Sequence, residues 1–214
     1  MAYLWEIILH QKKRETFDMG FLMGFLLSIF GYLLGSILFA KIIASYKGVD
    51  IASVGSKSAG ATNVTRTLGK KYGALVFFLD AFKGFLIAIL DRFYINPDSL
   101  WFGIVMVSPV VGHIYSYRAN FKGGKGVATA FGVVLGVSFM LALKMLLVWA
   151  IVFYLFRYVS LASITSVLVG YFLFLEGDFS GPEKIGASFI AFLILYKHKD
   201  NVFRLLNKEE YRFK

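Results

Sequence analysis

The 214-residue chain has no cysteine, and histidine and proline occur only three times each. Without thiols the chain can have no thiolate nucleophile, no covalent thioester on the protein, no disulfide and no cysteine-ligated metal. Its histidines, His10, His113 and His198, are too few for a histidine-rich metal site. We therefore predict that the protein binds no metal.

Acidic residues are also few: 13 Asp and Glu stand against 23 Lys and Arg, which gives a net charge of +10. Hydrophobic residues, in contrast, make up 58% of the chain, and the mean hydropathy is +0.69. A soluble domain of this length could not bury so much apolar surface. Because the basic residues lie in short clusters between apolar runs, they favour anionic lipid or an anionic substrate as partner over nucleic acid. The composition predicts an all-α integral membrane protein.

Residues 1–18 differ from the rest of the chain. They contain Lys12, Lys13 and Arg14 and match neither a membrane span nor a signal peptide, because their apolar part is too short and precedes the basic part. We interpret residues 1–18 as a non-native N-terminal extension, translated from an upstream start, with Met19 or Met23 as candidate native starts.

Seven apolar segments follow, several of them shorter than the ~20 residues that a full span prefers. They cover about 20–45, 72–90, 100–117, 127–141, 143–156, 161–175 and 185–196. The run from Val127 to Tyr158 could form one very long helix or two short helices that turn near Lys144.

The distribution of basic residues decides between these alternatives. With two short helices, the loops on one side of the membrane hold fifteen Lys and Arg residues, and the opposite loops hold only Arg92, Lys144 and Lys184. Cytoplasmic loops usually carry the excess of basic residues. We therefore predict seven spans in a domain of residues 19–197, with the N-terminus outside, and a basic cytoplasmic tail of residues 198–214 that contributes to the site.

A glycine- and lysine-rich stretch, NFKGGKGVAT at 120–129, stands at the start of the fourth apolar segment. Glycines let backbone N–H groups approach a ligand closely, and lysines supply charge for a phosphate, so the stretch is typical of an anion-binding loop. A basic loop that merely flanks a span is the alternative. A Walker A motif is excluded, because Ala119 stands where its first glycine belongs and Gly126 where its Ser or Thr belongs.

The predicted topology places three unusual segments, 55–66, 112–129 and 197–206, on one face of the membrane. They are rich in hydrogen-bond donors and nearly free of carboxylates, which suits phosphate oxygens. The donors are Ser56, Thr62, Asn63, Arg66, Lys122, Lys125, His198, Asn201 and Arg204.

Other polar residues have structural alternatives. Asp80 and Lys83, three residues apart in the second span, can neutralise each other on one helix face, and we interpret them as a structural pair. His198 could instead be an interfacial histidine at the end of the last span. Ser163 could be a helix cap or a packing residue.

At the three segments the chain resembles the bacterial family of membrane acyl-phosphate:glycerol-3-phosphate acyltransferases. The resemblance covers about residues 31–210 and rests on GATNVTR at 60–66 and FKGGKGVAT at 121–129. It implies seven spans, a cytoplasmic-side site and no cofactor. The implied reaction moves a fatty acyl group from acyl phosphate to the sn-1 hydroxyl of glycerol 3-phosphate, giving lysophosphatidic acid and phosphate in the first step of phospholipid synthesis.

Roles for individual residues also follow from the resemblance. The implied catalytic residues are Lys125, Arg66, Asn63 and His198. The implied substrate-binding residues are Ser56, Thr62, Gly123, Gly124, Ser163 and Asn201. The family usually has Gly and Asn where this chain has Lys57 and Ser58, a departure that adds a charge near the site. Two groups are candidates for the base that takes the hydroxyl proton. One is His198, and the other is the phosphate of glycerol 3-phosphate itself, whose second pKa is ~6.

Two other function classes fit parts of the same pattern less well than acyl transfer. A transporter of a phosphorylated anion would also place basic residues at the ends of short helices, but here the donors gather at one face and no internal repeat is visible. A lipid-binding scaffold would not explain Asn63 or Ser56. We predict glycerol 3-phosphate, acyl phosphate and membrane lipid as partners, with no nucleic acid and no obligate protein partner. The predicted location is the bacterial inner membrane, with the active site facing the cytoplasm.

Overall fold

The structure, a computed structural model, describes the backbone of residues 2–213 and the side chains of residues 19–213. All regular secondary structure in this part of the chain is helical, and it contains no strand, which confirms the predicted all-α class. The proposed extension, residues 1–18, lies outside the residues whose side chains are described. The helices are α1 (Ala2–Gly35), α2 (Phe39–Tyr46), α3 (Ala61–Leu68), α4 (Lys70–Tyr94), α5 (Leu100–Ile114), η1 (Tyr117–Ala119), α6 (Val127–Val137), α7 (Phe139–Phe156), α8 (Val159–Glu176), α9 (Gly181–Lys197) and α10 (Lys199–Leu206).

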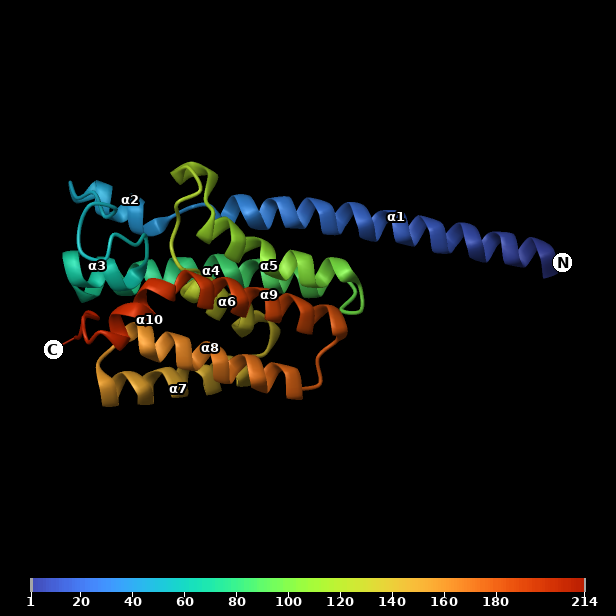
Figure 1. Cartoon of the computed structure of the whole chain (residues 1–214). Coiled ribbons are helices and arrows are strands. Elements are labelled where there is room, and N and C mark those ends of the chain that lie inside the picture. Colours follow the sequence, from blue (N-terminus) through green and yellow to red (C-terminus); the bar gives the residue numbers. More distant parts are fainter. Residues whose placement is uncertain (1, 214) are drawn as a thin grey trace.

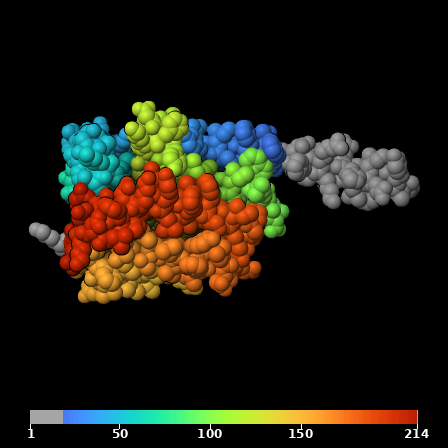
Figure 2. Space-filling model, viewed as in Figure 1, coloured from blue at the N-terminus to red at the C-terminus, as the bar shows by residue number. Residues whose placement is uncertain are grey.

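The long helices form a bundle in which successive helices alternate in direction (Figure 1). The short helices α2, α3 and α10 gather at one end of the bundle, and the loop that contains η1 lies on the same half (Figure 1). In the space-filling view, the residues of α9 and α10, in red, run along the visible face beside those of α8 (Figure 2). The bundle therefore has one end that carries most of the irregular chain.

Five helical segments in the described part of the chain are long and apolar enough to cross a membrane: 19–46, 70–94, 100–119, 139–156 and 159–176. The other two predicted segments correspond to α6, with 11 residues, and α9, with 17 residues. Large apolar side chains on the outside of the bundle stay exposed, including Phe78 at 65% and Phe172 at 62%. These surfaces suit contact with lipid.

The chain reverses direction between α6 and α7 at Ser138, and not near Lys144 as the sequence had suggested. Ser138 is extended, and its hydroxyl accepts a hydrogen bond from the Leu141 N–H, 3.3 Å away, so that it caps α7. Arg92 donates to the carbonyl of Val137, which α6 leaves without a helical partner. Lys144 lies on the exposed side of α7. The prediction of two short antiparallel helices is correct, but the position of the turn is wrong.

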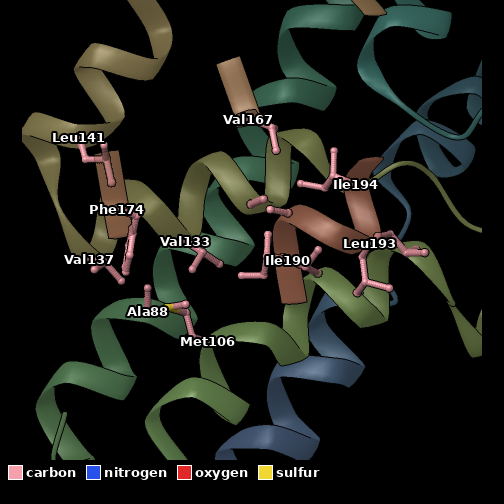
Figure 3. Packing of buried hydrophobic residues seen from close by; sticks show 14 residues of the cluster. Ala88, Met106, Val133, Val137, Leu141, Val167, Phe174, Ile190, Leu193 and Ile194 are labelled. Atoms are coloured by element: carbon pink, nitrogen blue, oxygen red, sulfur yellow. The ribbon is translucent and has the colours of Figure 1, made fainter. Parts of the chain in front are cut away.

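Close contact between α4 and α6 holds the centre of the bundle. A Cβ atom added to Gly84 or Gly132 would overlap backbone atoms of the facing helix, so only glycine permits this approach. Beside it lies a core built by α4, α5, α6, α7, α8 and α9 (Figure 3). It includes Met106, Val133 and Ile190.

The alternating bundle predicts that the loop after α8 and the segment after α10 lie on opposite sides of the membrane. The natural absence of cysteine makes single-cysteine labelling straightforward. Asp178→Cys and Asn207→Cys both replace exposed residues. A membrane-impermeant maleimide should label one variant in right-side-out vesicles and the other in inverted vesicles. Labelling of both from the same side would contradict this arrangement.

Candidate active site

The three polar segments predicted from the sequence meet around one cavity of about 140 Å³ at the end of the bundle that carries α3 and α10. The structure brings together these predicted site residues: Ser56, Thr62, Asn63, Arg66, Lys125, Ser163, His198 and Asn201. Gly123 and Gly124 do not line the cavity. Segments more than a hundred residues apart in sequence therefore build a single site.

Asn63, in α3, is buried and uses its whole amide group on the backbone. Its Oδ1 accepts from the Ser56 N–H at 2.9 Å, and its Nδ2 donates to the carbonyls of Ile51 at 3.1 Å and Val54 at 3.0 Å. These bonds fold the loop before α3 into one wall of the cavity. Asn63 thus shapes the site and has no donor left for a substrate.

Gly123 and Gly124 support the cavity from behind. The Gly123 N–H donates to the Ile114 carbonyl at 3.0 Å, and the Gly124 N–H donates to the His113 carbonyl at 3.1 Å. The expectation that these N–H groups bind a phosphate is wrong, because both are already bonded. A Cβ atom at either glycine would overlap His113. The glycines are needed because the loop packs directly on the end of α5, and this packing places Lys125 at the cavity.

Lys125 belongs to a chain of polar contacts that crosses the cavity wall. Its Nζ donates to Asn201 Oδ1, and Asn201 Nδ2 donates to Glu210 Oε1 at 3.0 Å. Arg204 Nε donates to Glu210 Oε2 at 2.8 Å. Glu210 is only 8% exposed and lines the cavity, although it belongs to the basic tail. The tail folds back over the site.

The cationic groups are partly removed from water. Burial lowers the pKa of Lys125 to about 8, and the neighbouring Glu210 carboxylate partly opposes this effect. Burial also lowers the pKa of Arg66, which stays charged because an arginine titrates far above neutrality. At neutral pH the cavity therefore contains two cations whose weak hydration favours an anionic ligand.

His198 is the residue between α9 and α10 and is 3% exposed, so it is not an interfacial histidine. Its Nδ1 lies 2.8 Å from the Ile194 carbonyl oxygen, which can only accept. The Nδ1 atom therefore carries a proton, and Nε2 is left as an acceptor. Burial, together with the nearby Lys125, lowers the pKa of His198 to about 4. The ring is neutral at pH 7 and is a weak base.

Arg66 is held by the C-terminal tail. Its guanidinium group lies 5.1 Å from the centre of the Tyr211 ring and 4.8 Å from the centre of the Phe213 ring, and it donates to the Tyr211 carbonyl at 3.2 Å. Cation–π contacts of this kind orient an arginine while leaving other donors free. Sequence reasoning found Arg66 but did not find the two aromatic residues that position it.

The N-terminal turns of three helices face the cavity. Its lining includes Ala61 and Thr62 of α3, Val127 and Ala128 of α6, and Ser160 of α8. The first N–H groups of a helix have no helical partner and give this end a partial positive charge. The three helix starts therefore add to the attraction for an anion.

A second cavity of about 490 Å³ adjoins the first and is lined mainly by apolar side chains of α4, α6, α7 and α8. The two cavities share part of their walls, including Phe77, Trp149 and Ser163. Ser163 Oγ accepts from Trp149 Nε1 at 3.2 Å. Ser163 therefore stands where the polar space meets the apolar space.

Two lining residues that sequence reasoning did not assign to the site are Asp80 and His113. Asp80 and Lys83 form the predicted ion pair, with Lys83 Nζ 2.8 Å from Asp80 Oδ1. His113 joins this pair from α5. The sequence signal for Asp80 was the presence of two charged residues, Asp80 and Lys83, within an apolar span.

The sequence profile of a family described as "Glycerol-3-phosphate acyltransferase" matches residues 25–208. A curated glycerol-3-phosphate acyltransferase of Hydrogenobaculum sp. (strain Y04AAS1) is 86% identical over 92% of this chain and 100% of its own length. A second, from Aquifex aeolicus (strain VF5), is 50% identical over 87% of this chain and 97% of its own length.

Two solved structures of PlsY, an integral membrane glycerol 3-phosphate acyltransferase, resemble the fold at 49% identity. The glycerol 3-phosphate form superimposes with a TM-score of 0.86 over 89% of this chain and 96% of that chain. The lysophosphatidic acid form superimposes with a TM-score of 0.83 over 89% of this chain and 95% of that chain.

The fold and the site thus define an integral membrane acyltransferase. The chain belongs to the glycerol-3-phosphate acyltransferase family, and it transfers an acyl group to glycerol 3-phosphate in phospholipid synthesis.

The lowered pKa of Lys125 predicts a basic limb in the pH–rate profile. Only the ammonium form attracts a phosphate, so activity should be full below the pKa and should fall as the pH rises through about 8. Lys125→Arg should move this limb above the pH range of the assay, because a guanidinium group does not lose its proton there.

Lys122→Arg is the matched control for Lys125→Arg. Lys122 lies in the same loop but is exposed and does not line the cavity. A basic limb that stays at about pH 8 in Lys125→Arg would show that another group titrates there.

Proposed function

We propose that the acyl donor of this enzyme is an acyl phosphate and that the acceptor atom is the sn-1 hydroxyl oxygen of glycerol 3-phosphate. The observation that carries this proposal is the junction of the two cavities at Ser163. A donor with a charged phosphate on one side of its carbonyl group and a long alkyl chain on the other fits such a junction. The products are lysophosphatidic acid and inorganic phosphate.

Two phosphate groups, one on each substrate, account for the donor set of the polar cavity. Lys125 and Arg66 supply positive charge, and the starts of α3, α6 and α8 supply N–H groups. The proposed roles follow this geometry. Lys125 and Arg66 stabilise charge on the leaving phosphate, Ser56 and Thr62 donate hydroxyl hydrogen bonds, and Asn63 shapes the wall.

The apolar cavity supports a fatty acyl donor. Its volume of about 490 Å³ lies within the usual range of ligand pockets, and its lining includes Phe131, Met145 and Phe153. Burying an alkyl chain there removes apolar surface from water or from the lipid interface. Ser163 then lies beside the acyl carbonyl carbon, where the chain meets the phosphate.

In the proposed reaction the sn-1 oxygen attacks the carbonyl carbon of the acyl phosphate. A new C–O ester bond forms, the bond between the carbonyl carbon and the phosphate oxygen breaks, and the phosphate leaves with the bonding electron pair. The hydroxyl proton passes to the phosphate dianion of glycerol 3-phosphate, whose second pKa is ~6. We assign to His198 the role of accepting a hydrogen bond from the glycerol, with Asn201 beside it. A histidine with a pKa of about 4 is a weak base at neutral pH.

The membrane arrangement is also part of the proposal. The bundle crosses the bacterial inner membrane with its seven apolar helical segments, the N-terminus is outside, and the polar cavity opens toward the cytoplasm. The basic residues near the cavity end support this orientation. Residues 198–213, which include Asn201 and Glu210, form a cytoplasmic tail that closes one side of the site.

Mass spectrometry of the products tests the donor. Purified enzyme in detergent receives glycerol 3-phosphate together with either acyl phosphate or acyl coenzyme A at equal concentration. Acyl phosphate should give lysophosphatidic acid and inorganic phosphate in equal amounts, and the thioester should give neither. Arg66→Ala, with an unchanged size-exclusion profile, should lose activity, because losing a partner of transition-state charge typically raises the barrier by ~2.7–4 kcal/mol.

Product from acyl coenzyme A at a comparable rate would contradict the proposed donor. Full activity of Arg66→Ala would contradict the assignment of the phosphate site. Arg118→Ala serves as the control, because Arg118 is exposed and does not line either cavity.

A further inference from the structure

Lys83, in the middle of α4, is a buried lysine whose ammonium group has four acceptors around it. Its Nζ lies 2.9 Å from the Gly35 carbonyl oxygen and 2.8 Å from that of Ile37. It also lies 2.8 Å from Asp80 Oδ1 and 2.9 Å from His113 Nδ1. The lysine is 1% exposed. A buried charge is costly unless it is paired, and these contacts meet that need.

Two of the acceptors lie at the break between α1 and α2. Helix α1 ends at Gly35, and α2 begins at Phe39, so the carbonyls between them have lost their helical partners. The break is also tied to α5 and to the turn after it, because Ser36 Oγ donates to the Gly112 carbonyl at 3.3 Å and Ser116 Oγ donates to the Ser36 carbonyl at 2.7 Å. Lys83 therefore joins the break in the first apolar segment to the end of α5.

The contact with Lys83 decides which nitrogen of His113 carries the proton. An ammonium group has three donors and no acceptor, so the Nδ1 atom must be the acceptor in this contact. Asp80 Oδ1 is 3.5 Å from the same Nδ1 atom, too far for a good hydrogen bond. The imidazole is therefore neutral with its proton on Nε2. His198 has the opposite arrangement, because its Nδ1 donates to a carbonyl.

The Nε2 atom of His113 lies beside the glycine loop. A Cβ atom added to Gly124 would overlap this nitrogen, and the His113 carbonyl accepts the Gly124 N–H. His113 lines the polar cavity. Since Nδ1 is occupied by Lys83, the Nε2–H group is the donor that the ring can offer there.

We propose that His113 is a further phosphate-binding residue of this site and that Lys83 is a positioning residue that holds its imidazole in the Nε2–H form. The inference rests on the proposed function, because the ligand is a phosphate group of one of the two substrates. A neutral donor fits beside the Lys83 ammonium, where an imidazolium would be repelled. Asp80 completes the cluster by balancing the charge of Lys83.

Two substitutions of His113 separate a role in binding from a role in folding. His113→Asn keeps an acceptor near the Nδ1 position for Lys83 but has no donor near the Nε2 position. His113→Gln reaches the Nε2 position with a donor but loses the acceptor near Nδ1. Removing a hydrogen bond to a charged group should raise the KM for one phosphate substrate about 10- to 100-fold in His113→Asn. His113→Gln should keep KM within about threefold, less than the effect of one ordinary hydrogen bond, with a lower melting temperature. The substrate whose KM rises, glycerol 3-phosphate or acyl phosphate, is the one whose phosphate group His113 binds.

A spectroscopic measurement reads the tautomer in the wild-type protein. The ¹⁵N chemical shifts of histidine-labelled protein distinguish a protonated ring nitrogen from an acceptor, and the His113 signals are assigned by their loss in His113→Asn. His113 should show Nε2–H and His198 should show Nδ1–H. Lys83→Met should abolish the single tautomer of His113 and leave that of His198 unchanged.

These results separate the inference from the proposed function. Wild-type turnover with acyl phosphate is measured first, and its absence would contradict the proposed donor alone. With the wild type active, His113→Asn with unchanged KM values for both substrates would overturn the binding role. An Nδ1–H tautomer of His113 in the wild-type protein would overturn the role of Lys83.

Discussion

The starts of α3, α6 and α8 line one cavity, and the N–H groups in the first turn of a helix, which have no helical partner, favour an anion there. In a membrane protein such groups are tolerated where they face an aqueous cavity or a bound ligand. The rest of the site follows from this constraint. Lys125 and Arg66 add charge to a place that already favours anions, and the glycine loop packs against α5 so that Lys125 reaches it.

The adjoining apolar cavity distinguishes this site from other anion-binding sites. A phosphate site alone would suit many soluble enzymes, but here it shares a wall with a space of about 490 Å³ that opens among α4, α6, α7 and α8. Ser163 and Trp149 mark the boundary. Phe213 belongs both to the apolar cavity and to the cation–π contact of Arg66, so the tail connects the two spaces. One substrate with a charged end and an alkyl end can therefore occupy both at once.

Much of this could be predicted from the sequence because apolar runs and donor-rich motifs are local signals. The long helices lie close to the predicted runs, although the first run is broken between Gly35 and Phe39. Eight of the ten predicted site residues, all except Gly123 and Gly124, meet at one cavity. The turn at Ser138 was missed because the charge of Lys144 was a stronger signal than a serine. In the structure, hydrogen bonds from Arg92 and to Ser138 decide the position of the turn.

Contacts between distant segments could not be predicted. Glu210 looks like a tail residue until the tail folds onto Asn201 and Arg204. Likewise, the glycine N–H groups looked free, but the end of α5 occupies them. His113 lies in the unusual segment 112–129, but nothing in its neighbourhood indicated its role, because its partner Lys83 lies thirty residues earlier in the chain.

The central claim is that a site of cations and neutral donors transfers the acyl group while the substrate phosphate takes the hydroxyl proton. The pH–rate profile of His198→Gln tests it most directly. The account predicts a higher KM for glycerol 3-phosphate and an acid limb that stays at pH ~6, the second pKa of a phosphate monoester. Loss of the acid limb, with a fall in kcat by the ~10²- to 10⁴-fold typical of a general base, would contradict the account.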